Sequence, residues 1–184
     1  MANTSTLEMA LLGLLRGKPQ SGYDLRKTFT TTAMRHYSDS PGSIYPALRR
    51  LEGRGWIRGA GPASGDRRQR QEFALTDEGG AVLIAWLEQE VGGEDVRLRL
   101  SELMLRFAFM DGNMPRSATV RFLGQLALGL DGYVGEMRAK FEEMSSKVPS
   151  LHTGLLAFES GIRGMEAQLA WVREARARLG ESLQ

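Results

Sequence analysis

The chain has 184 residues, of which 42% are hydrophobic and 25% charged, a composition that suits one globular domain or two small ones. It has no cysteine and only two histidines, which excludes disulfides and thiolate chemistry and leaves almost nothing for a zinc site or a histidine relay. The net charge is +2, but residues 1–75 carry twelve basic and six acidic side chains, whereas residues 76–184 carry twelve and sixteen. The excess of basic side chains in residues 1–75 suggests that this segment binds a polyanion, although chance clustering on a solvated surface gives the same asymmetry.

Three short helices are predicted over residues 5–17, 21–29 and 40–53. The first opens with the capping box Ser5-Thr-Leu-Glu8, and its leucines recur at helical spacing. The third has Ser40 as its N-cap and a proline at its first position. Its apolar stripe consists of Ile44, Leu48 and Leu51.

The sequence pattern then changes from helical to extended. Trp56–Arg58 is short and strand-like, a glycine-rich turn follows, and residues 67–75 alternate as a strand. The sequence therefore predicts a hairpin with a long, basic tip. Thr76 caps the next helix, which is expected to end near Glu90 or Val91.

The second half is predicted to be helical throughout. One helix is expected over residues 94–110, and two long helices over 115–144 and 151–179 carry apolar residues at alternating three- and four-residue spacing. These two helices could pair with each other, with a second chain, or with both; we expect a homodimer, because a lone hairpin leaves apolar surface in water. Close packing or space for a ligand could account for seven glycines within them: Gly124, Gly129, Gly132, Gly135, Gly154, Gly161 and Gly164.

Neither a membrane protein nor an enzyme is indicated. The longest apolar run, Ala81–Leu87, is far shorter than the ~20 residues that span a bilayer. The first residues lack the basic region of a signal peptide, so a cytoplasmic protein is expected. No catalytic motif is present, and we expect no catalytic residue, cofactor or metal site; His36 and His152 are interpreted as structural.

Three helices, a basic hairpin and a further helix form the order of a winged helix-turn-helix, in which a helix enters the major groove of DNA. Tyr45 and Arg49 lie one helical turn apart and can face the same surface. The expected fold is mostly α with a small β-hairpin wing. Its domains are a DNA-binding domain with its linking helix over residues 1–92 and a helical, coiled-coil-like dimerisation domain over residues 93–184.

Three segments carry a resemblance to a known family. Residues 41–57, Pro-Gly-Ser-Ile-Tyr-Pro-Ala-Leu-Arg-Arg-Leu-Glu-Gly-Arg-Gly-Trp-Ile, closely resemble the recognition-helix segment of PadR-family transcriptional regulators. Ser21-Gly-Tyr-Asp-Leu25 resembles the start of their second helix, and Phe73-Ala-Leu-Thr-Asp-Glu-Gly79 the end of their wing. Phe73 departs from the family pattern, which often has a tyrosine there, so this position is not assigned to DNA. The long helical tail resembles the larger C-terminal domain of one subgroup.

The resemblance implies a homodimer that binds an inverted-repeat operator in double-stranded DNA, usually as a repressor, through its helix-turn-helix and wing. It also implies that the C-terminal helices dimerise and, in some members, sense small molecules such as phenolic acids or drugs. Two alternatives to DNA contact remain open: the wing arginines could form a solubilising loop, and the tyrosine of the second helix could be a packing residue. The candidate DNA-binding residues are Tyr23, Ser40, Gly42, Ser43, Tyr45, Arg49, Arg67, Arg68 and Arg70.

Two further interpretations compete with or extend this one. The chain could be a winged-helix protein-interaction module that docks a partner through its helical C-terminal domain, although the basic hairpin argues against it. It could also sense a small aromatic effector, with Trp86 and Trp171 as the aromatic walls of the site. Ordinary packing in a core or at a dimer interface is the alternative explanation for both tryptophans.

Overall fold

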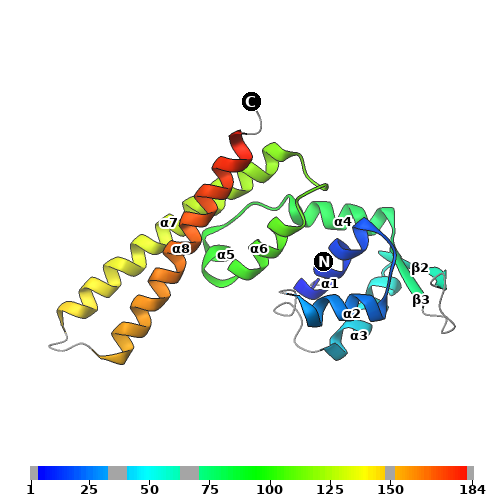
Figure 1. Cartoon of the computed structure of the whole chain (residues 1–184), viewed down its shortest axis with the longest axis horizontal. Coiled ribbons are helices and arrows are strands. Elements are labelled where there is room, and N and C mark those ends of the chain that lie inside the picture. Colours follow the sequence, from blue (N-terminus) through cyan, green and yellow to red (C-terminus); the bar gives the residue numbers. More distant parts are fainter. Residues whose placement is uncertain (1–3, 33–40, 63–70, 148–151, 182–184) are drawn as a thin grey trace. The chain divides into compact units, whose positions relative to one another are not determined.

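The structure, a computed structural model, describes residues 4–32, 41–62, 71–147 and 152–181. The chain forms two compact units, Met1–Leu87 and Glu88–Gln184, whereas the sequence suggested a boundary between residues 92 and 93. Helices dominate both units, and a small antiparallel sheet lies in the first (Figure 1). The predicted fold class is therefore confirmed.

The first unit has the element order of a winged helix-turn-helix. Its described elements are α1 (Thr6–Gly17), β1 (Gln20–Ser21), α2 (Gly22–Thr31), the 3-10 turn η2 (Pro41–Ser43), α3 (Ile44–Gly53), β2 (Ile57–Pro62), β3 (Gln71–Leu75) and α4 (Asp77–Leu87). Helix α4 ends before the predicted Glu90 or Val91. The residues that follow it include two acidic side chains, Glu88 and Glu90, which are unfavourable at the negative end of a helix dipole.

Side-chain caps fix the starts of the first two helices. The Ser5 hydroxyl accepts a hydrogen bond from the Glu8 N–H at 3.3 Å, and the Glu8 carboxylate accepts one from the Ser5 N–H at 3.1 Å, which confirms the capping box. The Ser21 hydroxyl accepts from the Asp24 N–H at 3.2 Å and so caps α2. The N-cap predicted for the third helix, Ser40, lies outside the described residues.

The core of the first unit lies between its helices. The predicted stripe of α3, Ile44, Leu48 and Leu51, is almost completely buried, as expected. Helix α3 contacts α1 and α2, and α1 also contacts α4. These helices also bury other large side chains: Leu7, Met9, Leu11, Leu12, Leu15, Leu25, Phe29, Leu83, Trp86 and Leu87.

The predicted hairpin forms, and it is joined by a strand that the sequence pattern did not reveal. Strands β2 and β3 pair antiparallel, with Ile57 opposite Leu75 and an irregularity between Gly59 and Pro62. The two-residue strand β1 pairs with the other edge of β3, so the sheet order is β1-β3-β2. The wing is thereby attached to the segment that leads into α2.

A backbone junction joins the end of α3, the wing and the start of α4. The Trp56 N–H donates to the Leu51 carbonyl at 3.0 Å, and the Trp56 carbonyl accepts from the Thr76 N–H at 3.1 Å. The Thr76 hydroxyl donates to the Gly55 carbonyl at 2.8 Å and accepts from the Gly79 N–H at 3.1 Å. Gly79 comes so close that a Cβ atom built there would lie 2.0 Å from the Trp56 carbonyl oxygen.

The second unit contains α5 (Gly93–Leu98), α6 (Leu100–Ala108), α7 (Arg116–Ser146) and α8 (Thr153–Glu181). The single helix predicted over residues 94–110 is wrong, because the chain leaves helical geometry at Arg99, with φ −133° and ψ 28°. Val96 and Leu103, on either side of the break, are both buried, whereas Leu98 is 74% exposed.

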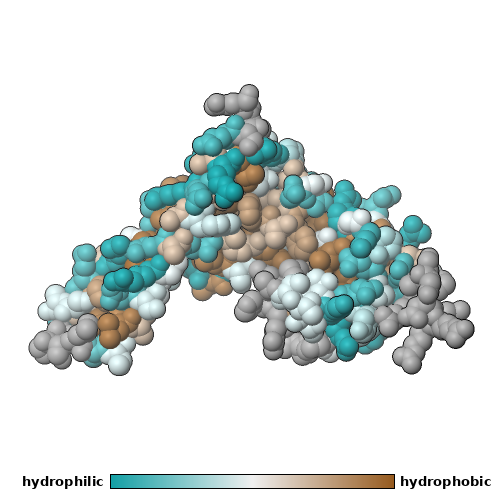
Figure 2. Space-filling model, viewed as in Figure 1, coloured by the Kyte–Doolittle hydropathy of each residue, from teal (hydrophilic) through white to brown (hydrophobic). Residues whose placement is uncertain are grey.

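Helices α7 and α8 pack against each other as an antiparallel hairpin (Figure 1). The Arg173 guanidinium of α8 pairs with the Asp131 carboxylate of α7 at 2.8 Å. Most residues of the two predicted stripes are buried or half-buried, and the fully buried ones are Leu123, Ala127, Leu130, Val134, Leu155, Ile162, Leu169 and Val172. Hydrophobic residues remain visible among hydrophilic ones on the face of the hairpin shown in Figure 2.

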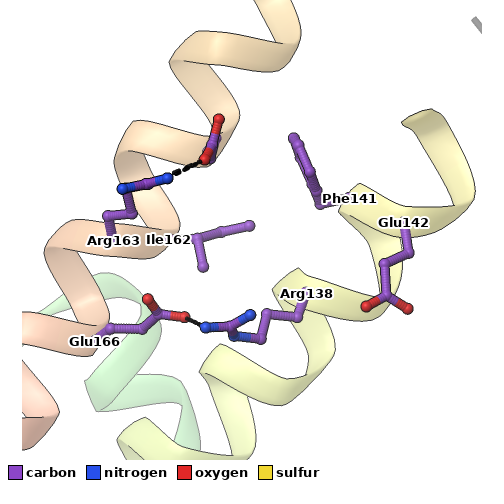
Figure 3. A pocket seen from close by; sticks show the side chains of 7 residues that line it. Arg138, Phe141, Glu142, Ile162, Arg163 and Glu166 are labelled. Carbon is purple, nitrogen blue, oxygen red and sulfur yellow. Dashed lines mark hydrogen bonds and ion pairs between the residues drawn. The ribbon is translucent and has the colours of Figure 1, made fainter.

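Near the connection between α7 and α8, the packing opens into a pocket of about 340 Å³. Phe141 of α7 and Ile162 of α8 extend into the space between the helices (Figure 3). An ion pair between Arg138 and Glu166 bridges the two helices on one side of that space. The Phe141 ring also meets Phe158 edge to face, with ring centroids 6.0 Å apart. The aromatic contact and the ion pair thus join the two helices at this end, together with the buried Ile162.

Of the seven glycines noted within α7 and α8, Gly124 and Gly154 would bring a Cβ atom to 3.3 Å from Arg176 and to 3.2 Å from His152. A Cβ atom at Gly129 would lie 2.7 Å from Val96, so α5 packs directly on the backbone of α7 there. At four others a Cβ atom would meet open space within the chain: Gly132, Gly135, Gly161 and Gly164. Close packing inside the chain therefore accounts for Gly129 and leaves these four unexplained.

The close approach at Gly79 yields a first prediction. Gly79→Ala should destabilise the first unit by about 1–3 kcal/mol, because the clash is with backbone that cannot turn aside, despite a gain in helix propensity. Urea unfolding of the full chain in a Trp171→Phe background, where Trp56 and Trp86 report the first unit, measures the change. In Gly80→Ala, the matched control, the nearest atom is 3.4 Å away at the tip of Arg16, and stability should hold or rise. Equal stability of the two variants would contradict the argument.

Candidate nucleic-acid interface

The candidate interface is a concavity of about 560 Å³ on the first unit. Three of the predicted DNA-binding residues, Tyr23, Tyr45 and Arg49, line it together. They come from the start of α2 and from α3, and β3 closes the other side. The remaining lining residues are Ser21, Gly22, Leu48, Glu52, Gln71 and Phe73.

The two tyrosines are unusual for large side chains of this unit because they are exposed, Tyr23 by 42% and Tyr45 by 44%. Exposed aromatic side chains with a polar tip suit a surface that binds a partner. The Tyr45 ring also covers the start of α2: a Cβ atom at Gly22 would lie 2.7 Å from its Cε1 atom. Glycine at position 22 thus allows the ring to lie against α2.

The other predicted residues fall in different places. Gly42 and Ser43 belong to η2, directly ahead of α3. Four candidates lie outside the described residues: Ser40, Arg67, Arg68 and Arg70. Arg58 of β2 is exposed and pairs in register with Ala74 of β3.

Sequence reasoning missed several polar residues that border this surface. The Arg26 guanidinium lies over the Tyr23 ring, 5.8 Å from its centroid, and places a cation on the exposed face of α2. Its position three residues after Tyr23 was the available signal. Glu52 and Gln71 also line the concavity, but only the folded hairpin brings them together.

A different side of α3 is bound to α1. The Arg50 Nε atom lies 2.6 Å from one carboxylate oxygen of Glu8, and the Arg54 Nη1 atom lies 3.2 Å from the other. Burial by itself would raise the pKa of Glu8, but hydrogen bonds from Arg50 and the Ser5 N–H and the positive charges of both arginines together hold that pKa below its usual value. Glu8 therefore remains an anion inside the unit.

The two tryptophans proposed for an effector lie in different surroundings. Trp86 of α4 is 5% exposed and belongs to the core of the first unit. Trp171 of α8 is 39% exposed, and its ring meets Phe107 edge to face at 5.7 Å in the second unit. Phe107 lines a pocket of about 440 Å³ together with Ala108, Asp111, Met114, Arg116, Thr119 and Leu179.

The part of the chain that the structure describes contains neither a cluster of metal-ligating side chains nor a helix that could span a membrane. Among residues 4–32, 41–62, 71–147 and 152–181, no group of three or more His, Cys, Asp or Glu side chains could hold a metal ion. In the same ranges, every helix is too short or too polar to cross a membrane.

The chain is similar to known regulators of transcription. Residues 11–85 match the model of the transcriptional regulator PadR-like family. The negative transcriptional regulator PadR of Bacillus subtilis is 30% identical over 150 residues, which cover 78% of this chain and 81% of that protein. A probable transcriptional regulator of Mycobacterium tuberculosis is 24% identical, with 95% and 98% of the two chains covered.

Solved structures that resemble the chain include Bacillus subtilis PadR in complex with operator DNA, at 23% identity and a TM-score of 0.43, with 94% of this chain and 98% of that chain covered. The PadR-like regulator BC1756 of Bacillus cereus is 24% identical, with a TM-score of 0.41 and coverage of 96% and 99%. The relatives are named as regulators of transcription, in agreement with the prediction that the chain is not an enzyme. The chain belongs to the PadR-like family of transcriptional regulators.

Proposed function

We propose that the chain is a homodimeric repressor that binds an inverted-repeat operator in double-stranded DNA. The observation that carries this proposal is the concavity in which Tyr23, Tyr45 and Arg49 meet on the exposed side of α2 and α3. Helix α3 is short, exposed along this side and preceded by a tight turn, as a helix that enters the major groove must be.

In this proposal the helix-turn-helix and the wing of the first unit make different kinds of contact with DNA. Arg49, with Tyr45 beside it, contacts base edges and supplies sequence preference. Gly42 and Ser43, ahead of α3, and Ser40 before them, approach the DNA backbone together with Tyr23. The wing arginines Arg67, Arg68 and Arg70 contact phosphates or the minor groove.

Single substitutions test this division. Arg49→Ala should cost about 1–3 kcal/mol on operator DNA and relax sequence preference, because a base contact is lost. Arg68→Ala should weaken operator and random DNA alike and lower the salt slope by about 1, because a phosphate contact is lost. Fluorescence anisotropy with DNA from upstream of the chain's own gene, at several salt concentrations and against random competitor, measures both effects. Equal losses on both DNAs for both variants would contradict the assignment, and binding indifferent to sequence and salt would favour the protein-docking module.

The contact between Gly22 and Tyr45 gives a sharper test of the concavity. Gly22→Ala should turn the exposed Tyr45 ring out of place and weaken operator binding without unfolding the unit. In a Tyr45→Ala background the same change should have little further effect, so the two positions should couple by about 0.5–3 kcal/mol. Anisotropy titrations of the four variants give the coupling. Gly53→Ala, where a Cβ atom meets open space, is the control, and additive effects would show that the ring is not involved.

The proposal of a dimer rests on apolar surface that the second unit leaves uncovered. Leu128 of α7 is 76% exposed, and Leu98, Met144, Leu156 and Trp171 are exposed as well. Gly132 and Gly135 of α7 and Gly161 and Gly164 of α8 face open space, which a second chain could enter. A monomer would leave this surface in water, so we assign the dimer interface to α7 and α8.

Leu128→Glu tests this interface. A charge at a solvated position costs little, but a charge buried between two chains destabilises their association strongly. The variant should therefore keep its helical circular dichroism and sediment as a monomer at concentrations where the natural chain is a dimer. Lys140→Glu, also exposed on α7, should remain dimeric. A dimeric Leu128→Glu protein would place the interface elsewhere.

For a small-molecule effector, the pocket beside Phe107 is the supporting observation, because its aromatic wall touches Trp171. We propose that a small aromatic effector binds there and releases the operator, while the assignment of Trp86 to an effector site stays a prediction. A complete switch requires about 5.5 kcal/mol of preference for one conformation.

Tryptophan fluorescence measures effector binding directly. Titration with p-coumaric acid, which is bound in a Bacillus subtilis PadR structure, and with other planar aromatic compounds should quench Trp171 and release labelled operator. Trp171→Phe should lose the quench, whereas Trp86→Phe should keep it. The absence of both quench and release across the series would leave the effector without support.

A further inference from the structure

We propose that Glu8 is a positioning and specificity-determining residue for DNA recognition, which withholds Arg50 of α3 and Arg54, the C-cap of α3, from DNA phosphates and leaves Arg49 as the arginine that α3 presents. The proposal rests on the DNA-binding function proposed above. Glu8 itself does not line the concavity and contacts no DNA in this account.

The geometry makes Glu8 a clamp between two helices. Its side chain is 2% exposed, and its two carboxylate oxygens take different arginines, Arg50 at 2.6 Å and Arg54 at 3.2 Å. The second oxygen also accepts the Ser5 N–H at 3.1 Å, so the carboxylate is tied to the first turn of α1. The clamp therefore holds one side of α3 against the start of α1.

Holding this side of α3 determines where Arg49 points. Residues 50 and 54 are one turn apart and lie on the same side of the helix, whereas residue 49 is rotated from residue 50 by about 100°. With Arg50 and Arg54 on α1 and Leu48 in the core, Arg49 is directed into the concavity beside Tyr45. A rotation of α3 would move all of these side chains together.

The two clamped arginines are close enough to solvent to matter if released. The Arg50 side chain is 50% exposed and that of Arg54 is 26% exposed. Arg54 also lies over the Trp56 ring, 5.0 Å from its centroid, at the start of the wing. Without Glu8, two flexible cations would be free to reach phosphates, which would strengthen binding to any DNA sequence.

Glu8→Gln tests the proposal, because glutamine has the same shape and can still accept the Ser5 N–H while it loses the charge that holds the arginines. Binding to random DNA should strengthen by about fivefold at 0.15 M salt for each freed arginine that reaches a phosphate, and the salt slope should steepen by about 0.9 for each. The preference for operator over random DNA should fall, because Arg49 is no longer held in place. A loss of folded protein alone would instead weaken binding to both DNAs equally and leave the salt slope unchanged.

Two further variants complete the design. Glu78→Gln removes an exposed carboxylate at the start of α4 and controls for the change in net charge. Adding Arg50→Gln and Arg54→Gln to Glu8→Gln should return random-DNA binding and the salt slope to their original values. If Glu8→Gln does not fold, the single variant Arg50→Gln tests the proposal instead. Because Arg50 is withheld from DNA, its loss should leave the salt slope of DNA binding unchanged. A salt slope lower than that of the natural chain would overturn the proposal.

The outcomes separate this inference from the function on which it rests. If the natural chain shows no preference for its operator, the proposed function fails first. If it shows that preference and Glu8→Gln behaves as Glu78→Gln does, DNA recognition stands and only the assignment of Glu8 is overturned.

Discussion

The backbone carbonyl of Trp56 is the point on which the arrangement of the first unit depends. Through the Trp56 N–H the residue is bonded to the end of α3, and through its carbonyl to Thr76, where β3 ends and α4 begins. Gly79 packs on the same carbonyl without room for a side chain. Main-chain atoms, which cannot change rotamer, therefore fix helix α3, the β2–β3 hairpin and helix α4 to one another. The concavity bounded by α3 and β3 has a defined width for this reason.

The parts of the fold predictable from sequence were those decided within one element. The capping box at Ser5 needs only residues of α1, and the stripes of α3, α7 and α8 need only a helical period. The missed features depend on distant partners. Strand β1 exists because β3 lies beside it, and the break at Arg99 reflects which apolar side chains of the second unit find cover. Neither partner is visible in a local window of sequence.

The candidate site likewise contains residues that could be predicted from the sequence and residues that could not. Tyr45 and Arg49 were predictable because their spacing places them on one side of a helix and because their segment resembles a known family. Glu52 and Gln71 were not, since they meet only when the hairpin folds beside α3. Glu8 was recognised as a helix cap, and that local explanation concealed its contact with arginines more than forty positions away. A residue whose side chain caps its own helix can thus also form ion pairs with residues far away in the sequence.

The hydrogen bond from the Ser5 N–H to Glu8 has a consequence for the entropy of folding. A free glutamate loses about 1.5–2 kcal/mol of side-chain conformational entropy when it is held in one rotamer. Here the first turn of α1 already holds the carboxylate, so most of that loss is incurred when the helix forms. Docking of α3 then requires ordering of the arginines alone, and the long-range ion pairs form on a preorganised anion. The capping box thus lowers the entropic cost of a tertiary contact as well as starting a helix.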